Sequence, residues 1–375
     1  MKLIPKFDEK KERNYSTIIK NFNLKKDFFE KYLDKFKKVK SCPICNNTDF
    51  LAIADQYRQF LFSDFTELDK DTKHYFNNIK FQINNEKQVM CTKCGLIFSN
   101  CNYDYQFFIE YMQIHDGSDP SSYSEDLLLV DKYYSISKHI NRVKIFNEEK
   151  YQDFKTGNKK FLEISSYRSW ALDELRNDFD VYGIEPHSQS IKFSNSKFPY
   201  LSNKITNNLF ELEEYNFLAN HKPFDVVLFS MCFRHMPDPY YSLKILDEIT
   251  NKDSIVIIDE SEFMDNICDK INSQQNTIED WQHQFQNSKL YYYSSVHIKY
   301  LMNLYSFELI DNYQTVDNKY PTLKQSLLIF KKIKKDKKNY TEEFLKNYQN
   351  LKILHKNSEI FTKFLNNQFL LFSIE

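Results

Sequence analysis

The chain has 375 residues, a formal net charge of −1, 17% aromatic residues and only four glycines. A chain of this length can bury one large core together with a small additional module. The near-neutral charge gives no overall basic field, so we expect no nucleic acid among its partners. No apolar run reaches the roughly 18 residues of a membrane span, and the charged start is unlike a signal peptide, so we expect no membrane span and a cytoplasmic protein.

The first 40 residues are rich in charge and carry apolar side chains at helical spacing between Phe28 and Phe36. This spacing predicts a helical segment over residues 1–40 that covers a neighbouring surface.

Two CxxC pairs follow, formed by Cys42 and Cys45 and, after a long interval, by Cys91 and Cys94. Two such turns complete a tetrahedron of soft ligands, which is the arrangement that structural zinc prefers. We therefore expect zinc within a module over residues 41–101, since a reducing compartment disfavours disulfides, and free or redox-active thiols are the alternative. Gly95 follows the last of these cysteines, where such a turn commonly needs a left-handed residue.

The stretch between the two pairs is longer than a minimal zinc ribbon needs, so a helix near 56–65 and a strand near 80–83 are expected there. Residues 102–155 contain turn-forming residues at 115–123, followed by a helical pattern, and predict a helical lid or linker.

Residues 159–188 show the pattern of a parallel strand crossover. A short apolar run at 161–164 ends in a polar turn, a helical stretch follows, and a second apolar run ends at Glu185. This order predicts strand, turn, helix and strand. A carboxylate at the tip of the second strand is where such folds hold a ribose, because it can accept from two neighbouring hydroxyl groups.

Further along, residues 198–205 predict a weak third strand and residues 209–218 a helix. Phe224–Ser230 is a strong buried strand, which is followed by the segment Met231–Pro239. A helix at 243–249 and a fifth strand at 254–259 complete this part of the pattern.

The remaining elements continue the alternation of strands and helices. We expect a helix over 295–304 after the Tyr-Tyr-Tyr-Ser stretch, then a strand that begins at Ser306-Phe307-Glu308-Leu309, and a last strand over 325–331. Residues 336–375 are lysine-rich and then amphipathic, which predicts a helical extension at the end of the chain.

Together these motifs resemble class I S-adenosylmethionine-dependent methyltransferases that carry a zinc-binding module and act on sugars or nucleotide sugars. The resemblance lies in the two CxxC pairs, in Leu162-Glu163-Ile164, in Gly183-Ile184-Glu185-Pro186, and in Phe224-Asp225-Val226-Val227 with the later His235-Met236-Pro237-Asp238-Pro239. It implies an α/β fold, with a Rossmann-like sheet covered by helices on both faces, over a core at residues 156–335. Where the family commonly has LEIG-x-G-x-G, this chain has Ser165, Tyr167 and Ser169 at the glycine positions. Either the turn takes a different geometry or its side chains partly fill the pocket.

The resemblance also implies site residues. The cofactor S-adenosylmethionine is expected to contact Glu163, Ser165, Arg168, Glu185, Asn207 and Ser230. His235 stands just beyond the fourth strand and is the candidate base that deprotonates the acceptor, with a packing role in the turn as the alternative. The neighbouring Arg234 favours an anionic acceptor.

The expected function is methyl transfer from S-adenosylmethionine to oxygen or carbon of a small molecule, either a sugar-linked or nucleotide-linked compound or a surface-glycan intermediate. The alternative is a catalytically degenerate protein that keeps the methyltransferase fold and serves as a binding or regulatory partner, which the glycine-poor turn favours.

Overall fold

The computed structural model describes residues 31, 37–55, 87–102, 104–115, 158–213, 216–260, 290–316 and 324–333. The expected helical extension at 336–375 and the helix and strand expected within the insert at 56–86 lie outside the described residues. Of the helical segment expected over 1–40, only residues 31 and 37–40 are described, and the expectation is wrong at its end, because Lys37 and Lys38 pair with Asn102 and Cys101 as a short strand. Of the expected lid, the structure describes helix α4 (Tyr105–His115).

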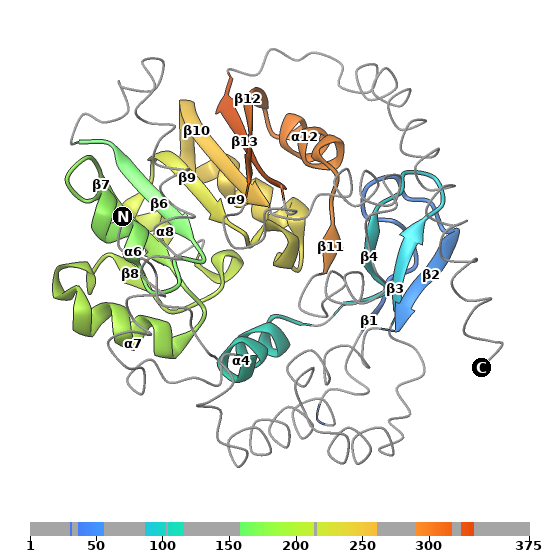
Figure 1. The fold of residues 1–375 in the computed structure, drawn as a ribbon, viewed down its shortest axis with the longest axis horizontal. Coiled ribbons are helices and arrows are strands. Elements are labelled where there is room, and N and C mark those ends of the chain that lie inside the picture. The colour runs from blue at the N-terminus through green and yellow to red at the C-terminus, as the bar shows by residue number, and fades with distance from the viewer. Residues whose placement is uncertain are drawn as a thin grey trace.

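A seven-stranded sheet forms the centre of the molecule (Figure 1). From one edge to the other its strands are β12 (Phe307–Val316), β13 (Lys324–Lys332), β10 (Thr250–Glu260), β9 (Phe224–Ser230), β6 (Lys160–Ile164), β7 (Asp180–Ile184) and β8 (Ile205–Thr206). The pairs β10–β9, β9–β6, β6–β7 and β7–β8 are parallel, whereas β13 runs antiparallel to both of its neighbours. The chain moves outward from β6 to β8 and then returns to β9 on the other side of β6. This reversal creates a topological switch point between β6 and β9, the place where open α/β sheets bind ligands at the carboxyl ends of their strands.

Side chains of the central strands alternate between two hydrophobic clusters, one on each face of the sheet. On β6, Phe161 belongs to one cluster and Leu162 to the other, and Leu228 and Phe229 on β9 divide in the same way. Such alternation is what a strand buried on both faces requires.

Helices cover both faces. They are α6 (Trp170–Leu175), α7 (Ser188–Lys197), α8 (Phe217–His221), α9 (Pro239–Ile249) and α12 (Ser295–Leu304), with short 3-10 helices η5 (Pro199–Leu201), η6 (Phe210–Leu212) and η7 (Phe233–His235). Buried residues of α6 and α7 join one cluster, whereas those of α9 and α12 join the other. The core therefore has three layers, with the sheet between two layers of helices. None of the helices that the structure describes is long and apolar enough to cross a membrane.

Most of the expected elements of the core are confirmed, including β6, β7, β9, β10, α9, α12 and β13. The expected third strand at 198–205 is wrong over most of its length. Phe198 packs edge-to-face on Trp170 with 5.2 Å between ring centroids, and Pro199 begins η5, so that only Ile205–Thr206 joins the sheet. Proline lacks the N–H group that a central strand must donate. The helix expected over 209–218 is replaced by η6 and α8.

The paired cysteines lie in a separate small module. Its four-stranded antiparallel sheet has the order β11 (Tyr291–Tyr292), β4 (Ile97–Ser99), β3 (Lys87–Cys91) and β2 (Phe50–Asp55), and a short pair joins β1 (Lys37–Lys38) to β5 (Cys101–Asn102). Strand β11 lies far later in the sequence than β4, and its Tyr291 pairs with Phe98 (Figure 1). The sheet of the module is therefore completed by the chain segment that precedes α12.

Candidate active site and metal centre

The four cysteines of the CxxC pairs converge on one point. The sulfur atoms of Cys42, Cys45, Cys91 and Cys94 all lie within 4.8 Å of one another, and the pairs Cys42–Cys94 and Cys45–Cys91 are each 3.5 Å apart. Thiolates bound at 2.3 Å to a tetrahedral zinc ion lie about 3.8 Å from each other, so the cluster fits that ion. Cys101, which is buried nearby, does not belong to the cluster.

The two CxxC turns have matching backbone geometry. The amide of Asn46 donates to the carbonyl of Cys42 and the amide of Gly95 donates to that of Cys91, both at 2.9 Å. Asn46 and Gly95 have φ angles of 57° and 72°. The left-handed residue expected at Gly95 is therefore confirmed, and asparagine, which tolerates this conformation better than most residues, has the same role in the first turn.

The thiols of the cluster shift one another's pKa values. The contact with Cys42 lowers the pKa of Cys45 to about 7, while the contact with Cys42 raises the pKa of the Cys94 thiol. Four adjacent thiolates repel one another, and the positive charge of a divalent cation among them offsets that repulsion and favours deprotonation of the thiols that coordinate it.

The cysteine module is attached to the core through the backbone of the CxxC turns. Tyr240, at the start of α9, donates its hydroxyl to the carbonyl of Pro43 at 2.7 Å. The Nε2 atom of His297, in the first turn of α12, lies 3.0 Å from the carbonyl oxygen of Cys94. Loss of the turn geometry would therefore disturb the amino ends of both α9 and α12.

The turn after β6 keeps a left-handed backbone although its glycines are absent. Ser165, Tyr167 and Ser169 have φ angles of 62°, 48° and 58°. These are the three positions at which the resembled motif has glycine, so the backbone takes here the left-handed conformation that glycine adopts most easily. The amides of Ser165 and Ser166 hold the turn against β7, since both donate to the carbonyl of Ile184, at 2.9 and 3.1 Å.

Glu185 links this turn to the tip of β7. Its carboxylate accepts from the amide of Tyr167 at 2.6 Å and from the amide of His187 at 2.8 Å, and the side chain is buried. A carboxylate offers about four acceptor positions, so two backbone donors are compatible with further hydrogen bonds to ribose hydroxyl groups. The side chain expected to hold a ribose thus lies directly beside the left-handed turn.

Arg168 and Trp170 turn toward the helices that flank the sheet. Arg168 is only 1% exposed, with its guanidinium carbon 4.8 Å from the ring centroid of Tyr167 and 5.7 Å from that of Phe193 on α7. Trp170 packs against Phe193 and Phe198 in the hydrophobic cluster beneath α6 and α7. The indole therefore belongs to the core.

The other expected cofactor contacts lie along the same carboxyl edge. Glu163 is fully buried, one residue before the end of β6, and Ser230 is the last residue of β9. Asn207 directly follows β8 and donates its Nδ2 to the backbone carbonyl of Glu185 at 2.8 Å. The structure thus brings the ends of four neighbouring strands together around the turn.

His235 ends η7, the 3-10 helix that follows β9. The thiol of Cys232, at the start of this segment, lies 3.4 Å from the carbonyl of Ile164, which ties the segment to the end of β6. The Nε of Arg234 donates to the Nε2 of His235 at 3.3 Å. Nε2 is the accepting nitrogen in this hydrogen bond, so the atom that a base would use is engaged by the arginine.

Sequence reasoning missed Glu211 on η6. Its carboxyl is buried and accepts from the Ser242 hydroxyl at 2.8 Å, and burial raises its pKa to about 7. Ser242 lies in the first turns of α9, close behind Asp238, whose negative charge also raises the pKa of Glu211. Because glutamate is common and only the fold brings η6 against α9, nothing in the local sequence indicated this site.

The comparison with known protein families matches the part of the chain that contains these strands and turns. Residues 135–312 match the family model for a methyltransferase domain. The central sheet and its covering helices accordingly have the Rossmann-like methyltransferase fold that the sequence predicted. No curated protein matches the chain.

Solved structures with a similar fold include two methyltransferases determined with bound S-adenosylhomocysteine. Magnesium protoporphyrin IX methyltransferase from Synechocystis PCC 6803 shares 10% identity, with a TM-score of 0.40, over 61% of this chain and 100% of its own. The N-methyltransferase NodS from Bradyrhizobium japonicum WM9 shares 10% identity, with a TM-score of 0.41, over 61% of this chain and 98% of its own.

Proposed function

We propose that this protein is an S-adenosylmethionine-dependent methyltransferase. The observation that carries the proposal is the left-handed turn at 165–169, held by the carboxylate of Glu185 at the carboxyl edge of the sheet. This edge, next to the switch point between β6 and β9, is where open α/β sheets bind nucleotide-like ligands. The family match over residues 135–312 points to the same activity.

The residues around the turn would hold the cofactor, which supplies an activated methyl group on a sulfonium. Glu185 would accept from the ribose hydroxyl groups, and Glu163 and Ser165 would contribute to the part of the site that takes the methionine portion. Arg168 would pair with the cofactor carboxylate, a role that requires its guanidinium to leave its present position between Tyr167 and Phe193. Asn207 and Ser230 lie at the edges of the site, at the ends of the neighbouring strands β8 and β9.

His235 would remove the proton from the acceptor. Methyl transfer from a sulfonium is an in-line displacement, so the protein mainly aligns the acceptor atom, excludes water and takes up the acceptor proton. The Nε2 of His235 would accept this proton once the contact with Arg234 opens. An acceptor with an anionic group would draw the Arg234 guanidinium away from the imidazole.

We further propose that the acceptor is a small molecule linked to a sugar or a nucleotide. The support is the order of motifs along the chain and the packing of the cysteine module against the segment that follows His235, as in the contact between Asn102 and Pro237. Zinc bound by the four cysteines would be structural, since four protein ligands leave no open position.

Calorimetric titration with S-adenosylmethionine and with S-adenosylhomocysteine tests the proposal. We expect both to bind with micromolar affinity, and Glu185→Gln to weaken binding at least tenfold because it removes the charge that holds the ribose hydroxyl groups. Glu248→Gln is the matched control, because Glu248 is exposed on α9 and, within the part of the chain that the structure describes, forms an ion pair only with Lys244. Absence of binding at millimolar ligand would reject the proposal.

A non-catalytic binding protein is the second candidate. It is favoured by the chain's own use of the site: the Glu185 carboxylate accepts from Tyr167 and His187, and Arg168 is buried beside the turn. If the protein is such a non-catalytic binding protein, the same titrations give no heat, and neither ligand raises its melting temperature.

A further inference from the structure

His297, in the first turn of α12, connects two parts of the fold that lie far apart in the sequence. Its buried Nδ1 atom lies 3.0 Å from the amide nitrogen of Ser294 and 2.9 Å from its hydroxyl oxygen. The hydroxyl oxygen of Ser294 in turn accepts from the amide of His297 at 3.3 Å, which completes a capping box at the start of α12. On the other side of the ring, Nε2 lies 3.0 Å from the carbonyl oxygen of Cys94, 203 residues earlier.

The two backbone partners of the imidazole determine where it carries its proton. A backbone amide can only donate, so Nδ1 must accept from Ser294. A carbonyl oxygen can only accept, so Nε2 must carry the hydrogen and donate it to Cys94. Because both partners are backbone groups, they hold the ring as a neutral imidazole in one tautomer and one orientation.

The peptide group between Cys94 and Gly95 is held at both of its polar ends. Its N–H, which belongs to Gly95, donates to the carbonyl of Cys91, and its carbonyl, which belongs to Cys94, accepts from His297. The orientation of this peptide group sets the direction of the adjoining Cys94 side chain. His297 itself is not one of the four residues whose ligand atoms converge, among those that the structure describes. It therefore acts on a metal ligand from outside the coordination sphere.

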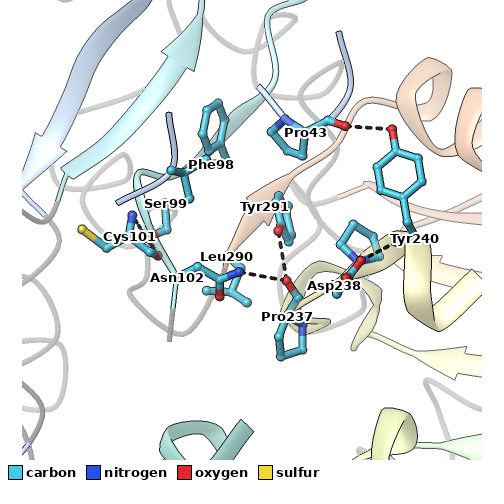
Figure 2. Close-up of a pocket in the computed structure, with 12 residues that line it drawn as sticks. Pro43, Phe98, Ser99, Cys101, Asn102, Pro237, Asp238, Tyr240, Leu290 and Tyr291 are labelled. Atoms are coloured by element: carbon cyan, nitrogen blue, oxygen red, sulfur yellow. Dashed lines mark hydrogen bonds between the residues drawn. The ribbon is translucent and has the colours of Figure 1, made fainter. Parts of the chain in front are cut away.

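Strand β11, which precedes α12, connects the cysteine module to η7. On one side it pairs with β4 of the module. On the other side, the amide of Leu290 donates to the carbonyl of Arg234 at 3.1 Å. The hydroxyl of Tyr291 donates to the carbonyl of Pro237 at 3.3 Å, beside the pocket drawn in Figure 2. The segment that carries His235 is thus held by the strand that leads into α12.

We propose that His297 is a positioning residue for the metal centre, which makes zinc binding by the cysteines and the ordering of the amino end of α12 mutually dependent. Zinc orders the turn that presents the carbonyl of Cys94, and the ring that donates to this carbonyl caps α12 through Nδ1. Such coupling is reciprocal, so removing the donor weakens zinc binding and removing zinc loosens the start of α12. The inference rests on the zinc site of the proposed function and not on methyl transfer.

Substitutions of His297 separate its donor role from its capping role. His297→Asn places Oδ1 as many bonds from the backbone as Nδ1, so it can accept from Ser294 but cannot reach Cys94. His297→Gln places an amide nitrogen as many bonds from the backbone as Nε2, so it can donate to Cys94. His297→Ala removes both groups. Lys299→Ala is the matched control, because Lys299 is exposed on the same helix.

Competition between the full-length protein and a chromophoric chelator measures the zinc affinity of each variant. We expect His297→Ala and His297→Asn to bind zinc about tenfold or more weakly than the wild type, the usual effect of losing a group that orients a metal ligand. His297→Gln should stay within about threefold of the wild type, and Lys299→Ala should be unchanged. If His297→Ala does not fold, as judged by circular dichroism, the comparison of His297→Asn with His297→Gln decides.

Hydrogen exchange tests the coupling in the other direction. Chelation of zinc should raise the exchange of the amides at 295–301 in the wild type by about tenfold or more, and by much less in His297→Asn. The proposal is overturned if His297→Asn binds zinc as tightly as the wild type, if His297→Gln binds it as weakly as His297→Ala, or if chelation raises exchange equally in both proteins.

The same measurements keep this proposal separate from the proposed function. Wild-type protein that binds no zinc would overturn the metal centre and the role of His297 together. Absence of S-adenosylmethionine binding, with the expected zinc affinities in all variants, would reject methyl transfer and support the role of His297.

Discussion

Replacing Ser165 by glycine should stabilise the protein. Ser165 has a φ angle of 62°, and a left-handed conformation costs a residue with a side chain about 1–2 kcal/mol. Glycine removes that cost but adds about 0.5–1 kcal/mol of conformational entropy to the unfolded chain. The hydrogen bond from the Ser165 amide to Ile184 is made by the backbone and stays in place. The net gain in the free energy of unfolding is about 0.5–1 kcal/mol.

Ser196→Gly is the matched control for this prediction. Ser196 is exposed within α7, where glycine is a poorer helix former than serine by about 0.5 kcal/mol, so this variant should be destabilised. Urea unfolding followed by the fluorescence of Trp170, which begins the helix after the turn, measures both changes. The two variants should differ by about 1–1.5 kcal/mol, taking the sum of these effects. Equal destabilisation of both would refute the left-handed turn.

Three further predictions test other parts of the structure. Cys91→Ser should release zinc, measured by metal analysis, and lower the melting temperature, whereas Cys101→Ser should retain one zinc ion per chain. His235→Ala should reduce turnover at least a hundredfold with cofactor affinity unchanged, and unaltered turnover would exclude it as the base. The pKa of Glu211 is about 7 in the folded protein against an ordinary value of 4.5, so stability should fall by about 3 kcal/mol as pH rises between these values. Glu211→Gln should remove that decline and be the more stable protein at pH 8; a decline that persists in the variant would show that another group causes it.

The sequence predicted the core elements well where hydrophobic periodicity is strong. The buried strand Phe224–Ser230 and the helix Ser295–Leu304 were predicted with the boundaries that the structure shows. The third strand failed because the aromatic residues around 198–200 have high strand propensity, whereas tertiary packing of Phe198 against Trp170 decides their conformation. The pairing of β11 with β4 also escaped prediction, since no local pattern records a contact between segments so far apart in sequence.

The candidate site was predicted in part. The cysteine cluster follows from spacing alone, because a CxxC turn determines where its two thiols lie. The conformation of the turn at 165–169 could not be inferred, because residues with side chains rarely take positive φ angles. It is maintained by long-range hydrogen bonds to Ile184 and Glu185.

A crystal structure of the protein with S-adenosylhomocysteine would test the central claim most directly. The account predicts that the nucleoside lies beside residues 165–169, with its ribose hydroxyl groups within hydrogen-bonding distance of the Glu185 carboxylate and the turn still left-handed at Ser165 and Tyr167. A structure grown at saturating ligand in which Glu185 contacts only Tyr167 and His187, with no nucleoside beside the turn, would contradict it.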